Sequence, residues 1–466
     1  MPRPHFLLVS YAAQGHINPT LQFAKCLIRI GAHVTFTTSL SARRRMTEVP
    51  KAEGLSFVTF SDGYDDGLKP NDDREKYGAE FKRRGTENLN NLIASSNEEG
   101  KPITCIVYSL LITWAMEVAR EHQIPCAILW IQPASVFDIY YFYFNGYEET
   151  IKRQAEGEPK CLIKLPGLPP LANRDLPSFV GNQSAYPAAI NFFQKQFELI
   201  AQETNPKILV NTFDALEPEA LNAIEKFKMI AVGPLIPSSF LGRGTDPLDG
   251  SLKADLFQGS KDYVQWLGSK PNSSVIYISF GSIAALAKQQ VEEIARALLA
   301  GGRPFLWVLR NQKLNGVIET EQDKLSCKEE LEQVGMIVPW CSQLEVLSHP
   351  SLGCFVTHCG WNSTLESLAS GVPLVAFPQW TDQPTNAKLI EDVWGNGVRV
   401  RGNEEGIVER DEINRCLDLV MGDEERAKEV RRNAQKWKDL AREAAKEGGS
   451  LDRNLKSFID DLAHKD

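Results

Sequence analysis

Short apolar runs alternate with longer amphipathic stretches along the first half of the chain. The runs are rich in Val, Ile, Leu and Phe, which is typical of strands that are buried on both faces. The stretches between them repeat apolar residues with the period of a helix. We predict strands at residues 5–10, 33–37, 55–60, 103–108, 126–130 and 208–211. Strands that alternate with helices in this way form a parallel, doubly wound sheet.

The alternation stops at residues 232–260 and then begins again. This segment is rich in Gly, Pro, Ser and Asp and has little periodicity, which is typical of a linker between domains. Further strands are predicted at residues 274–279, 305–309, 336–338, 352–356, 373–377 and 398–400. The fold class is therefore α/β, with two Rossmann-like doubly wound domains that face each other across a cleft. The predicted parts are a first domain at 1–240, a linker at 241–260, a second domain at 261–448 and a last helix at 449–466.

Composition excludes several classes of partner. The 466-residue chain carries a formal net charge of −9, which argues against nucleic acid or an anionic membrane as a partner. Its nine cysteines are scattered and form no CxxC pair, so we expect reduced thiols in the cytoplasm and no metal site. We recognise no signal peptide, and no apolar stretch approaches the roughly 20 residues that a membrane helix needs.

Residues 340–383 hold the densest group of chemically useful side chains. A strand-like run at 352–356 leads into Thr357-His358-Cys359-Gly360, and a helical pattern follows from 361 to 370. The first N–H groups of a helix have no partner within the helix, and the helix dipole is positive there. The turn therefore suits a diphosphate without a lysine or a metal.

Side chains after this turn extend the pattern toward a nucleotide. Asn362, Ser363 and His358 can each donate a hydrogen bond to a phosphate. Glu366 lies one turn after Asn362 on the same helix face, where its carboxylate could accept both hydroxyls of a ribose. Taken alone, His358 would be a structural histidine and Glu366 a solvated helix residue.

The two ends of the segment suit the base and the sugar. Trp340 follows an apolar strand and could stack on a uracil, although a single Trp of this kind is more often part of a core. Asp382 and Gln383 follow the predicted strand 373–377, at the carboxyl end where open α/β sheets bind ligands. The order and spacing of all these residues together favour a nucleotide-sugar site.

The segment resembles the signature box of the plant family-1 UDP-glycosyltransferases. Other stretches that resemble family landmarks are HFLLVSYAAQGHINPTLQFAK, ILVNTFDALE, VGPL and SVIYISFGS. VYSLLITWAMEVAREHQIP and LWIQPASVFDIYYFYFNGY are similar to the branch of anthocyanin 5-O-glucosyltransferases and crocetin glucosyl-ester-forming enzymes. The resemblance implies a GT-B type fold whose last helix packs back on the first domain. It also implies inverting sugar transfer from a UDP-sugar, without a metal, to a small apolar plant metabolite.

The resemblance further implies the donor-site residues. In the family, Trp340 and Gln343 would hold the uracil, with the backbone of Cys341 in reach. Trp at the place of Trp361 and Gln at the place of Gln383 go with glucose, so UDP-glucose is the expected co-substrate. The implied set is Ser282, Trp340, Cys341, Gln343, His358, Trp361, Asn362, Ser363, Glu366, Trp380, Asp382 and Gln383.

The candidate catalytic base is His16. It follows the first predicted strand and precedes a helix expected from Asn18, with Pro19 in the first turn. A neutral histidine there can accept a proton from a hydroxyl. A helix-capping histidine is the alternative, and the resemblance favours the general base. Ser282 occupies a similar junction in the second domain and resembles the family's phosphate-contacting serine. The alternative is a simple N-cap, and the two roles are compatible.

Ser109 departs from the family pattern. Family members usually place an Asp here, which orients the catalytic histidine and stabilises its charged form. A serine hydroxyl can orient an imidazole but cannot offset its charge. A phenol with a pKa near 10 needs a good base, whereas a carboxylic acid with a pKa of about 4 arrives ionised. We hypothesise that the acceptor is a carboxylic acid; acidic flavonoid hydroxyls are the alternative.

The acceptor site is expected in the first domain. An aromatic-rich stretch at 130–147 could line a slot for a flat apolar acceptor, although at helical spacing most of its rings are expected in the core. Residues 165–180, with four prolines, are expected to form a loop near the acceptor. Two other functions stay open, namely a UDP-glucose-binding protein with little or no transferase activity and a sugar-nucleotide epimerase. We expect a monomer whose ligands are small molecules.

Overall fold

Two compact units make up the chain in the computed structural model. The first comprises Met1–Pro170, Phe179–Phe257 and Glu443–Asp466, and the second comprises Leu171–Ser178 and Gln258–Arg442. The structure describes residues 3–46, 48–69, 71–156, 162–181, 185–242, 244, 246, 248–249, 262–284, 286–314, 317–320 and 325–463. The linker expected at 241–260 falls largely outside these residues.

The division departs from the expected domains in two places. Leu171–Ser178 belongs to the second unit, although it precedes the last strands of the first sheet. The chain returns to the first unit at Glu443, before the expected boundary at 449. Both segments are assigned by their tertiary contacts, which sequence periodicity does not report.

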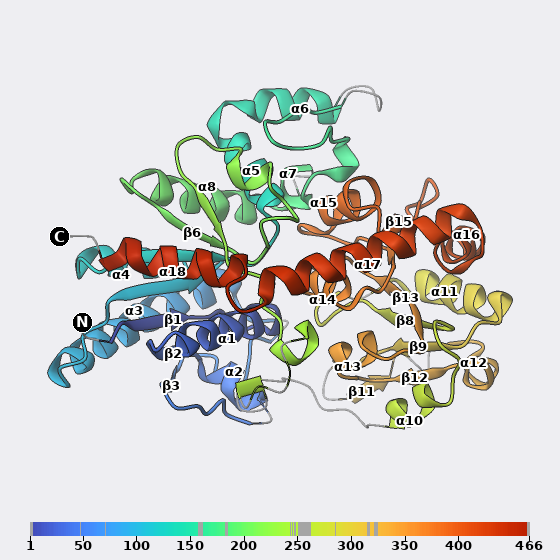
Figure 1. The fold of residues 1–466 in the computed structure, drawn as a ribbon, viewed down its shortest axis with the longest axis horizontal. Helices are drawn as coiled ribbons and strands as arrows, with labels where there is room; N and C mark the ends of the chain where they lie inside the picture. Colours follow the sequence, from blue (N-terminus) through green and yellow to red (C-terminus); the bar gives the residue numbers. More distant parts are fainter. Residues whose placement is uncertain are drawn as a thin grey trace. The chain divides into compact units, whose positions relative to one another are not determined.

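A seven-stranded parallel sheet forms the centre of the first unit, in the order β3-β2-β1-β4-β5-β6-β7 (Figure 1). The strands are β1 (His5–Val9), β2 (His33–Ser39), β3 (Leu55–Phe60), β4 (Cys105–Ser109), β5 (Cys126–Trp130), β6 (Lys207–Val210) and β7 (Met229–Ala231). Six of them confirm the predicted strands to within two residues. β7 was not predicted because its three residues are too short to show a period.

The strand order reverses between β1 and β4. From β1 the chain continues to β2 and β3 on one side, and it then crosses to β4 on the other side of β1. The carboxyl ends of two such strands form a crevice in which open α/β sheets bind ligands. In the first unit this place is occupied by the turn after β1 and by Ser109 at the end of β4.

Helices connect the strands of the first unit. They are α1 (Gln14–Arg29), α2 (Leu40–Arg45), α3 (Arg74–Glu98), α4 (Trp114–Glu121), α5 (Ala134–Phe142), α6 (Glu148–Glu156), α8 (Pro187–Ala201) and α18 (Ser450–Ala463), with α7 (Ser178–Gly181) at the boundary of the units. The prediction that the first helix starts at Asn18 was wrong. The Ala13 carbonyl accepts the N–H groups of His16 and Ile17 at 2.9 and 3.0 Å, so the first turn forms earlier and Pro19 lies inside the helix.

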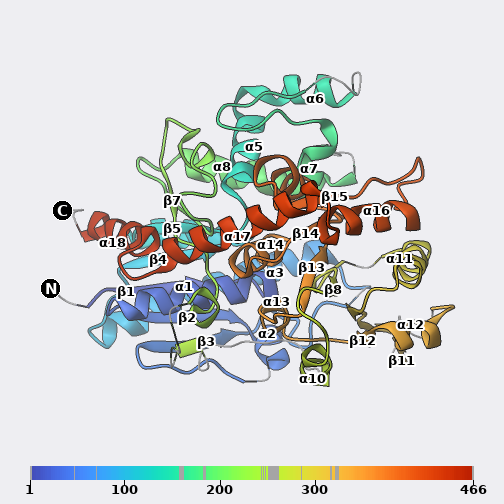
Figure 2. The same ribbon diagram turned by 45° about the vertical axis from the view of Figure 1, so that its right-hand side comes forward.

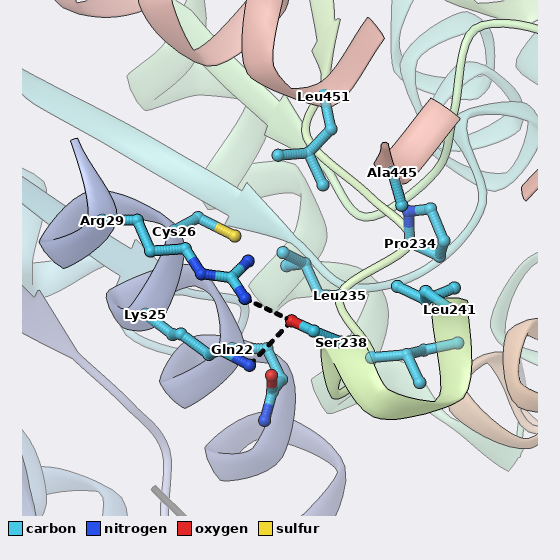
Figure 3. Close-up of a pocket in the computed structure, with 11 residues that line it drawn as sticks. Gln22, Lys25, Cys26, Arg29, Pro234, Leu235, Ser238, Leu241, Ala445 and Leu451 are labelled. Atoms are coloured by element: carbon cyan, nitrogen blue, oxygen red, sulfur yellow. Dashed lines mark hydrogen bonds between the residues drawn. The ribbon is translucent and has the colours of Figure 1, made fainter. Parts of the chain in front are cut away.

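Buried charges fasten α1 to the segment after β7. The ammonium of Lys25 is 1% exposed, donates to Ser238 Oγ at 2.8 Å and pairs with Asp249 and with Asp246, the latter at 2.9 Å. Arg29 donates to the same Ser238 Oγ at 2.6 Å, as Figure 3 shows. A buried ammonium is tolerated only when it is paired in this way. The small pocket beside this group is therefore lined by charges that already have partners.

The second unit repeats the architecture with a six-stranded sheet, in the order β12-β9-β8-β13-β14-β15. Its strands are β8 (Val275–Ser279), β9 (Phe305–Val308), β12 (Met336–Val338), β13 (Leu352–Thr357), β14 (Leu374–Ala376) and β15 (Gly397–Arg399). All six were predicted to within two residues. A separate hairpin of β10 (Asn311–Leu314) and β11 (Val317–Thr320) was missed, although the Asn-Gly pair at 315–316 is a hairpin signal in the sequence.

The second sheet also has a switch point, between β8 and β13. From β8 the chain passes to β9 and β12 on one side, and β13 then pairs on the other side of β8. The helices of this unit are α10 (Asp262–Gly268), α11 (Lys288–Gly301), α12 (Lys328–Val334), α13 (Gln343–Leu347), α14 (Trp361–Ser370), α15 (Gln383–Lys388), α16 (Arg410–Met421) and most of α17 (Glu425–Ala445). The predicted helix at 361–370 is confirmed, and it ends at Gly371 with a φ of 73°.

The last helix, α18, packs on the first sheet. It follows the predicted break at Gly448-Gly449 and lies beside β7 in Figure 2. Phe458 is fully buried with its ring centroid 6.3 Å from that of Phe6, and Asn454 donates to the Ala231 carbonyl at 2.9 Å. Across the described residues, every helix is either too short or too polar to span a lipid bilayer.

Candidate active site

His16 and Ser109 meet at the switch point of the first sheet. His16 lies in the first turn of α1, and its Nδ1 is 3.2 Å from the Oγ of Ser109. The N–H of Tyr11 donates to the same Oγ at 3.1 Å, and the Tyr11 ring lies 5.3 Å from the imidazole. Ser109 therefore contacts the histidine at the place where the family pattern puts an Asp.

Burial keeps His16 neutral. Desolvation lowers the pKa of His16 to about 4 and is its only resolved cause, so no acidic group among the described residues offsets a charge on the ring. At pH 7 the imidazole therefore carries one proton and has one free ring nitrogen.

The hydroxyl of Ser109 can select which nitrogen is free. Its oxygen already accepts from Tyr11, and its own proton can point to the Leu110 carbonyl at 3.5 Å. It can then accept the Nδ1–H of His16 with its second lone pair, which leaves Nε2 of His16 as the base. The tautomer is inferred from these partners.

His358 lies at the switch point of the second sheet, between two glycines. A Cβ on Gly281 would lie 2.6 Å from the His358 ring, and one on Gly360 would lie 2.5 Å from its Nε2. No side chain can occupy either place without moving the imidazole. Burial lowers the pKa of His358 to about 4, although a hydrogen bond from the ring to the Ser279 backbone favours its charged form, so the ring is neutral.

The start of α14 is a candidate site for an anion. Its N-cap is Gly360, and no side chain caps the helix. The first turn of the helix, at Trp361, Asn362 and Ser363, is the place where a helix N-terminus can bind an anion. Ser282 follows Gly281 directly, after β8. The structure thus brings Ser282, His358 and the helix start to one end of the second sheet.

Arg310 supports this group and was missed from the sequence. It follows β9, and its guanidinium donates to the Ser282 carbonyl and, at 2.6 Å, to the Ala284 carbonyl. Its positive charge also contributes to the lowered pKa of His358. The residues next to Arg310 in the sequence do not indicate that it supports the Ser282 loop, because its partners lie in a different part of the chain.

Gln343 links the predicted uracil and ribose positions. Its Nε2 donates to Ser363 Oγ at 2.9 Å and to a carboxylate oxygen of Glu366 at 2.6 Å. Trp340 lies partly buried in the loop before α13, and the thiol of Cys341 is buried. The backbone of Cys341, rather than its buried thiol, is the part that we expect to contact a uracil.

The ring of Trp361 is part of the core. Trp361 is 4% exposed, and its ring centroid lies 5.9 Å from that of Trp394. Its backbone lies at the helix start, but its indole packs against the body of the unit. Any effect of Trp361 on a bound sugar would therefore be indirect, because its buried ring helps to position α14.

The loop before α15 holds the predicted sugar-binding groups. Asp382 is 5% exposed and accepts from Thr381 Oγ1 at 2.7 Å and from Asn386 Nδ2 at 2.6 Å. The carbonyl oxygen of Gln383 accepts the N–H groups of Gln379 and Trp380 at 2.9 and 3.0 Å. The amide N–H groups of Gln383 are the part of the side chain that can donate to sugar hydroxyls.

Asn386 joins this loop to the diphosphate turn. Besides Asp382, its Nδ2 donates to the carbonyl of Cys359 at 2.8 Å, and the residue is fully buried. Burial raises the pKa of Asp382, while the bonds from Thr381 and Asn386 favour its charged form. Sequence reasoning missed Asn386 because its two partners lie in separate loops.

Most of the aromatic stretch at 130–147 belongs to the core of the first unit. Trp130, Phe137 and Tyr140 have no exposed surface, and the Tyr140 ring stacks 4.0 Å from that of Phe193. These rings cannot line a slot that is open to an acceptor. Tyr141, Phe144 and Tyr147 stay partly exposed. Within the described residues, no group of three or more His, Cys, Asp or Glu side chains is arranged to hold a metal ion.

The fold and the site define a nucleotide-sugar-dependent transferase of the GT-B type, and comparison with known proteins shows the family. Residues 247–441 match the family model "UDP-glucoronosyl and UDP-glucosyl transferase". The chain is 59% identical to phloretin 4'-O-glucosyltransferase of Malus domestica, over 99% of this chain and 98% of the relative. It is 58% identical to the chloroplastic crocetin glucosyltransferase of Gardenia jasminoides, over 98% of this chain and 97% of the relative.

A solved structure agrees with these relatives. Os79 from O. sativa, in complex with UDP, superposes with a TM-score of 0.84 at 34% identity and covers 98% of this chain and 100% of its own. The chain belongs to the UDP-glycosyltransferase family of plant secondary metabolism and is an enzyme of the glucosyltransferase class.

Proposed function

We propose that the protein transfers glucose from UDP-glucose, with inversion, to a hydroxyl or carboxyl group of a small apolar plant metabolite. The observation that carries the proposal is the neutral His16, held through Nδ1 by Ser109 at the switch point of the first sheet. The relatives named for phloretin and crocetin supply the two acceptor classes, a phenol and a carboxylic acid. We propose a monomer in the cytoplasm, which size-exclusion chromatography and cell fractionation test.

In this mechanism Nε2 of His16 faces the acceptor oxygen. The oxygen attacks the anomeric carbon of the UDP-sugar from the face opposite the diphosphate, the bond to UDP breaks, and any acceptor proton passes to Nε2. Asp382 and the amide N–H groups of Gln383 hold the glucose hydroxyls. Their own bonds to Asn386 and to the loop backbone fix their orientation before the sugar binds.

Negative charge develops on the leaving UDP. The N–H groups at Trp361–Ser363, the neutral His358 and Ser282 would stabilise that charge in this proposal. Arg310 holds the loop of Ser282 and adds a positive charge near His358. These groups supply the stabilisation that a divalent cation would otherwise provide, so the proposed reaction uses no metal.

The weak basicity of His16 favours an acidic acceptor. Burial holds the pKa of His16 far below that of a phenol, near 10, so proton transfer from a phenol to this imidazole is unfavourable. Among the described residues, no carboxylate stabilises the imidazolium that would form. A carboxylic acid is ionised at pH 7 and avoids this cost. We therefore propose a carboxylate as the preferred acceptor, with acidic flavonoid hydroxyls as the alternative.

An acceptor screen tests the proposal. The purified protein is incubated with UDP-glucose and matched phenols and aromatic carboxylic acids, with and without EDTA, and β-glucoside and glucosyl-ester products are quantified. We expect ester formation at the higher kcat/KM and no effect of EDTA. His16→Ala is expected to lower kcat/KM about 100-fold or more for phenols, the range of general-base catalysis, and less than tenfold for carboxylates.

Two results would contradict parts of the proposal. If His16→Ala lowered kcat/KM by the same factor for phenols and for carboxylates, Ser109 would not select an ionised acceptor. Tight UDP binding by calorimetry without any glucoside would instead favour the second candidate, a UDP-glucose-binding protein. The specific observation behind that candidate is the missing carboxylate partner of His16.

A further inference from the structure

A buried tyrosine lies beneath the residues proposed to hold the ribose. Tyr277 is the central residue of β8 and is 1% exposed. Its hydroxyl lies 3.3 Å from the amide oxygen of Gln343 and 3.5 Å from the thiol of Cys341. Burial raises the pKa of Tyr277, so the hydroxyl keeps its proton. None of the donor roles discussed above uses this residue.

The direction of each hydrogen bond follows from the chemistry of the partners. A carboxylate only accepts, so the amide NH2 of Gln343 must face Glu366 and its oxygen must face Tyr277. The Tyr277 hydroxyl must then donate to Gln343. Its oxygen is left to accept, from the Cys341 thiol and from the Ser279 side chain, which also hydrogen-bonds to it.

The result is a one-way chain of hydrogen bonds from strand to helix. It runs from the Cys341 thiol to Tyr277, from Tyr277 to Gln343, and from Gln343 to both Ser363 and Glu366 on α14. All three bonds of the Gln343 amide are used, so the amide has one orientation. Glu366 is thereby held toward Gln343 before any nucleotide arrives.

We propose that Tyr277 is a positioning residue for nucleotide recognition, acting through Gln343 to hold the Glu366 carboxylate where it accepts the ribose hydroxyls. This inference rests on the proposed function, which assigns the ribose to Glu366. It adds a residue of the β8 strand, outside the 340–383 segment, to the determinants of donor specificity. Without the Tyr277 hydroxyl, the Gln343 oxygen loses the donor that it has among the described residues, and the amide no longer has a fixed orientation.

Tyr277→Phe tests the proposal by donor discrimination. KM and kcat are measured for UDP-glucose and for 2'-deoxy-UDP-glucose, which lacks one hydroxyl that Glu366 would bind. We expect KM for UDP-glucose to rise about 3- to 10-fold, the effect of one net hydrogen bond, with kcat nearly unchanged. KM for the deoxy donor is expected to change little, so the preference for UDP-glucose falls by the same factor.

Tyr263→Phe is the matched control. Tyr263 is a buried tyrosine of α10 whose hydroxyl accepts the Ser342 N–H at 3.1 Å and donates to Glu345 at 2.8 Å. It supports the same turn as Tyr277 but does not touch Gln343. Loss of the Tyr263 hydroxyl is expected to leave the preference between the two donors unchanged, even if it lowers the stability of the protein.

Glu366→Ala and Gln343→Ala complete the design. If Glu366→Ala keeps the wild-type KM and donor preference, the ribose assignment itself is wrong. Tyr277 has no positioning role if Glu366→Ala loses the preference for UDP-glucose while Tyr277→Phe retains it. The same conclusion follows if Tyr277→Phe raises KM equally for both donors. Tyr277→Phe should also add no further loss in a Gln343→Ala background, because both changes break the same chain; additive losses would overturn the inference.

Discussion

At the residue scale, two histidines in corresponding places show how burial sets charge. His16 and His358 follow β1 and β13, and burial lowers the pKa of each to about 4. Both are therefore neutral at pH 7, which is the state that the proposed reaction requires of His16. The unfolded chain, with histidine pKa values near 6.5, binds these protons more readily, so stability falls as pH drops from about 6.5 toward 4.

Asp138 shows the opposite case and yields a prediction at this scale. It is fully buried on α5, and neither carboxyl oxygen has a hydrogen-bond partner among the described residues. Burial, with the nearby Glu217, raises its pKa well above the usual range. The folded state therefore holds a proton that the unfolded state releases, and this group lowers stability as pH rises above about 4.

Asp138→Asn is expected to be more stable than the wild type, increasingly so from pH 5 to pH 8. The change is isosteric and removes only the ionisation, and each kcal/mol recovered raises Tm by about 2–4 °C. Thermal unfolding across this pH range measures the gap. Glu217→Gln is the contrasting variant, because each carboxyl oxygen of Glu217 accepts an N–H, from Ala134 and Ser135, and an amide would place an NH2 group against one of these donors, which should lower Tm. A pH-independent gap for Asp138→Asn would contradict the argument.

At the scale of elements, Leu171–Ser178 is a strap that supports the sugar-binding loop. Asp175, 2% exposed, accepts from Arg399 at 2.7 Å, and its carbonyl accepts from Thr385 at 2.7 Å. The N–H of Ser178 donates to the Thr381 carbonyl at 2.8 Å. The strap thus contacts both the loop that carries Asp382 and the helix that follows it.

Asp175→Asn is expected to weaken binding of the sugar without weakening that of UDP. Loss of the charge leaves Arg399 buried without its anion, which should cost about 3 kcal/mol of stability and loosen the loop. We expect a raised KM for UDP-glucose, while the Kd of UDP, measured by calorimetry, changes less than twofold. Asp392→Asn is the control, since its pair with Lys388 is half-exposed and surface pairs contribute about 0–1 kcal/mol. A parallel loss of UDP affinity in Asp175→Asn would contradict this role.

At the scale of the whole molecule, the end of the chain completes the first unit. Leu451, Leu455 and Phe458 of α18 are buried in that unit, although they follow the second unit in sequence. Lys207, on β6, pairs with Asp461 at 3.2 Å. The first sheet therefore depends on residues that follow the second unit in the sequence.

Phe458→Ala is expected to destabilise the first unit and spare nucleotide binding. Removing a fully buried phenylalanine costs about 3–5 kcal/mol. Thermal unfolding should show a lower first transition, while the Kd of UDP at 25 °C stays unchanged. Lys456→Ala, at an exposed position on the same helix, should leave both values as in the wild type. Loss of UDP binding in folded Phe458→Ala would show that the two units are not separable in this way.

Much of the fold could be predicted because its strands are continuous apolar runs. Twelve strands were predicted to within two residues, and α14 was placed from Trp361 to its terminating glycine. The failures have local causes. β7 is too short for a period, and α1 begins early because the Ala13 carbonyl nucleates its first turn. The rings of Trp130 and Tyr140, expected in the core from their helical spacing, are fully buried.

The sequence by itself determined the two doubly wound sheets and the strand, turn and helix start around residues 357–363. These depend on neighbouring residues, since a strand, a turn and a helix start form from a continuous segment. Tertiary structure decided which distant side chains meet. His16 and Ser109 are 93 positions apart, and they touch because β1 and β4 pair in a register that sets Val9 beside Tyr108. Tyr277 reaches Gln343, and Gln343 reaches Glu366, for the same reason: sheet register and helix packing, which no local pattern encodes, bring them within hydrogen-bond distance.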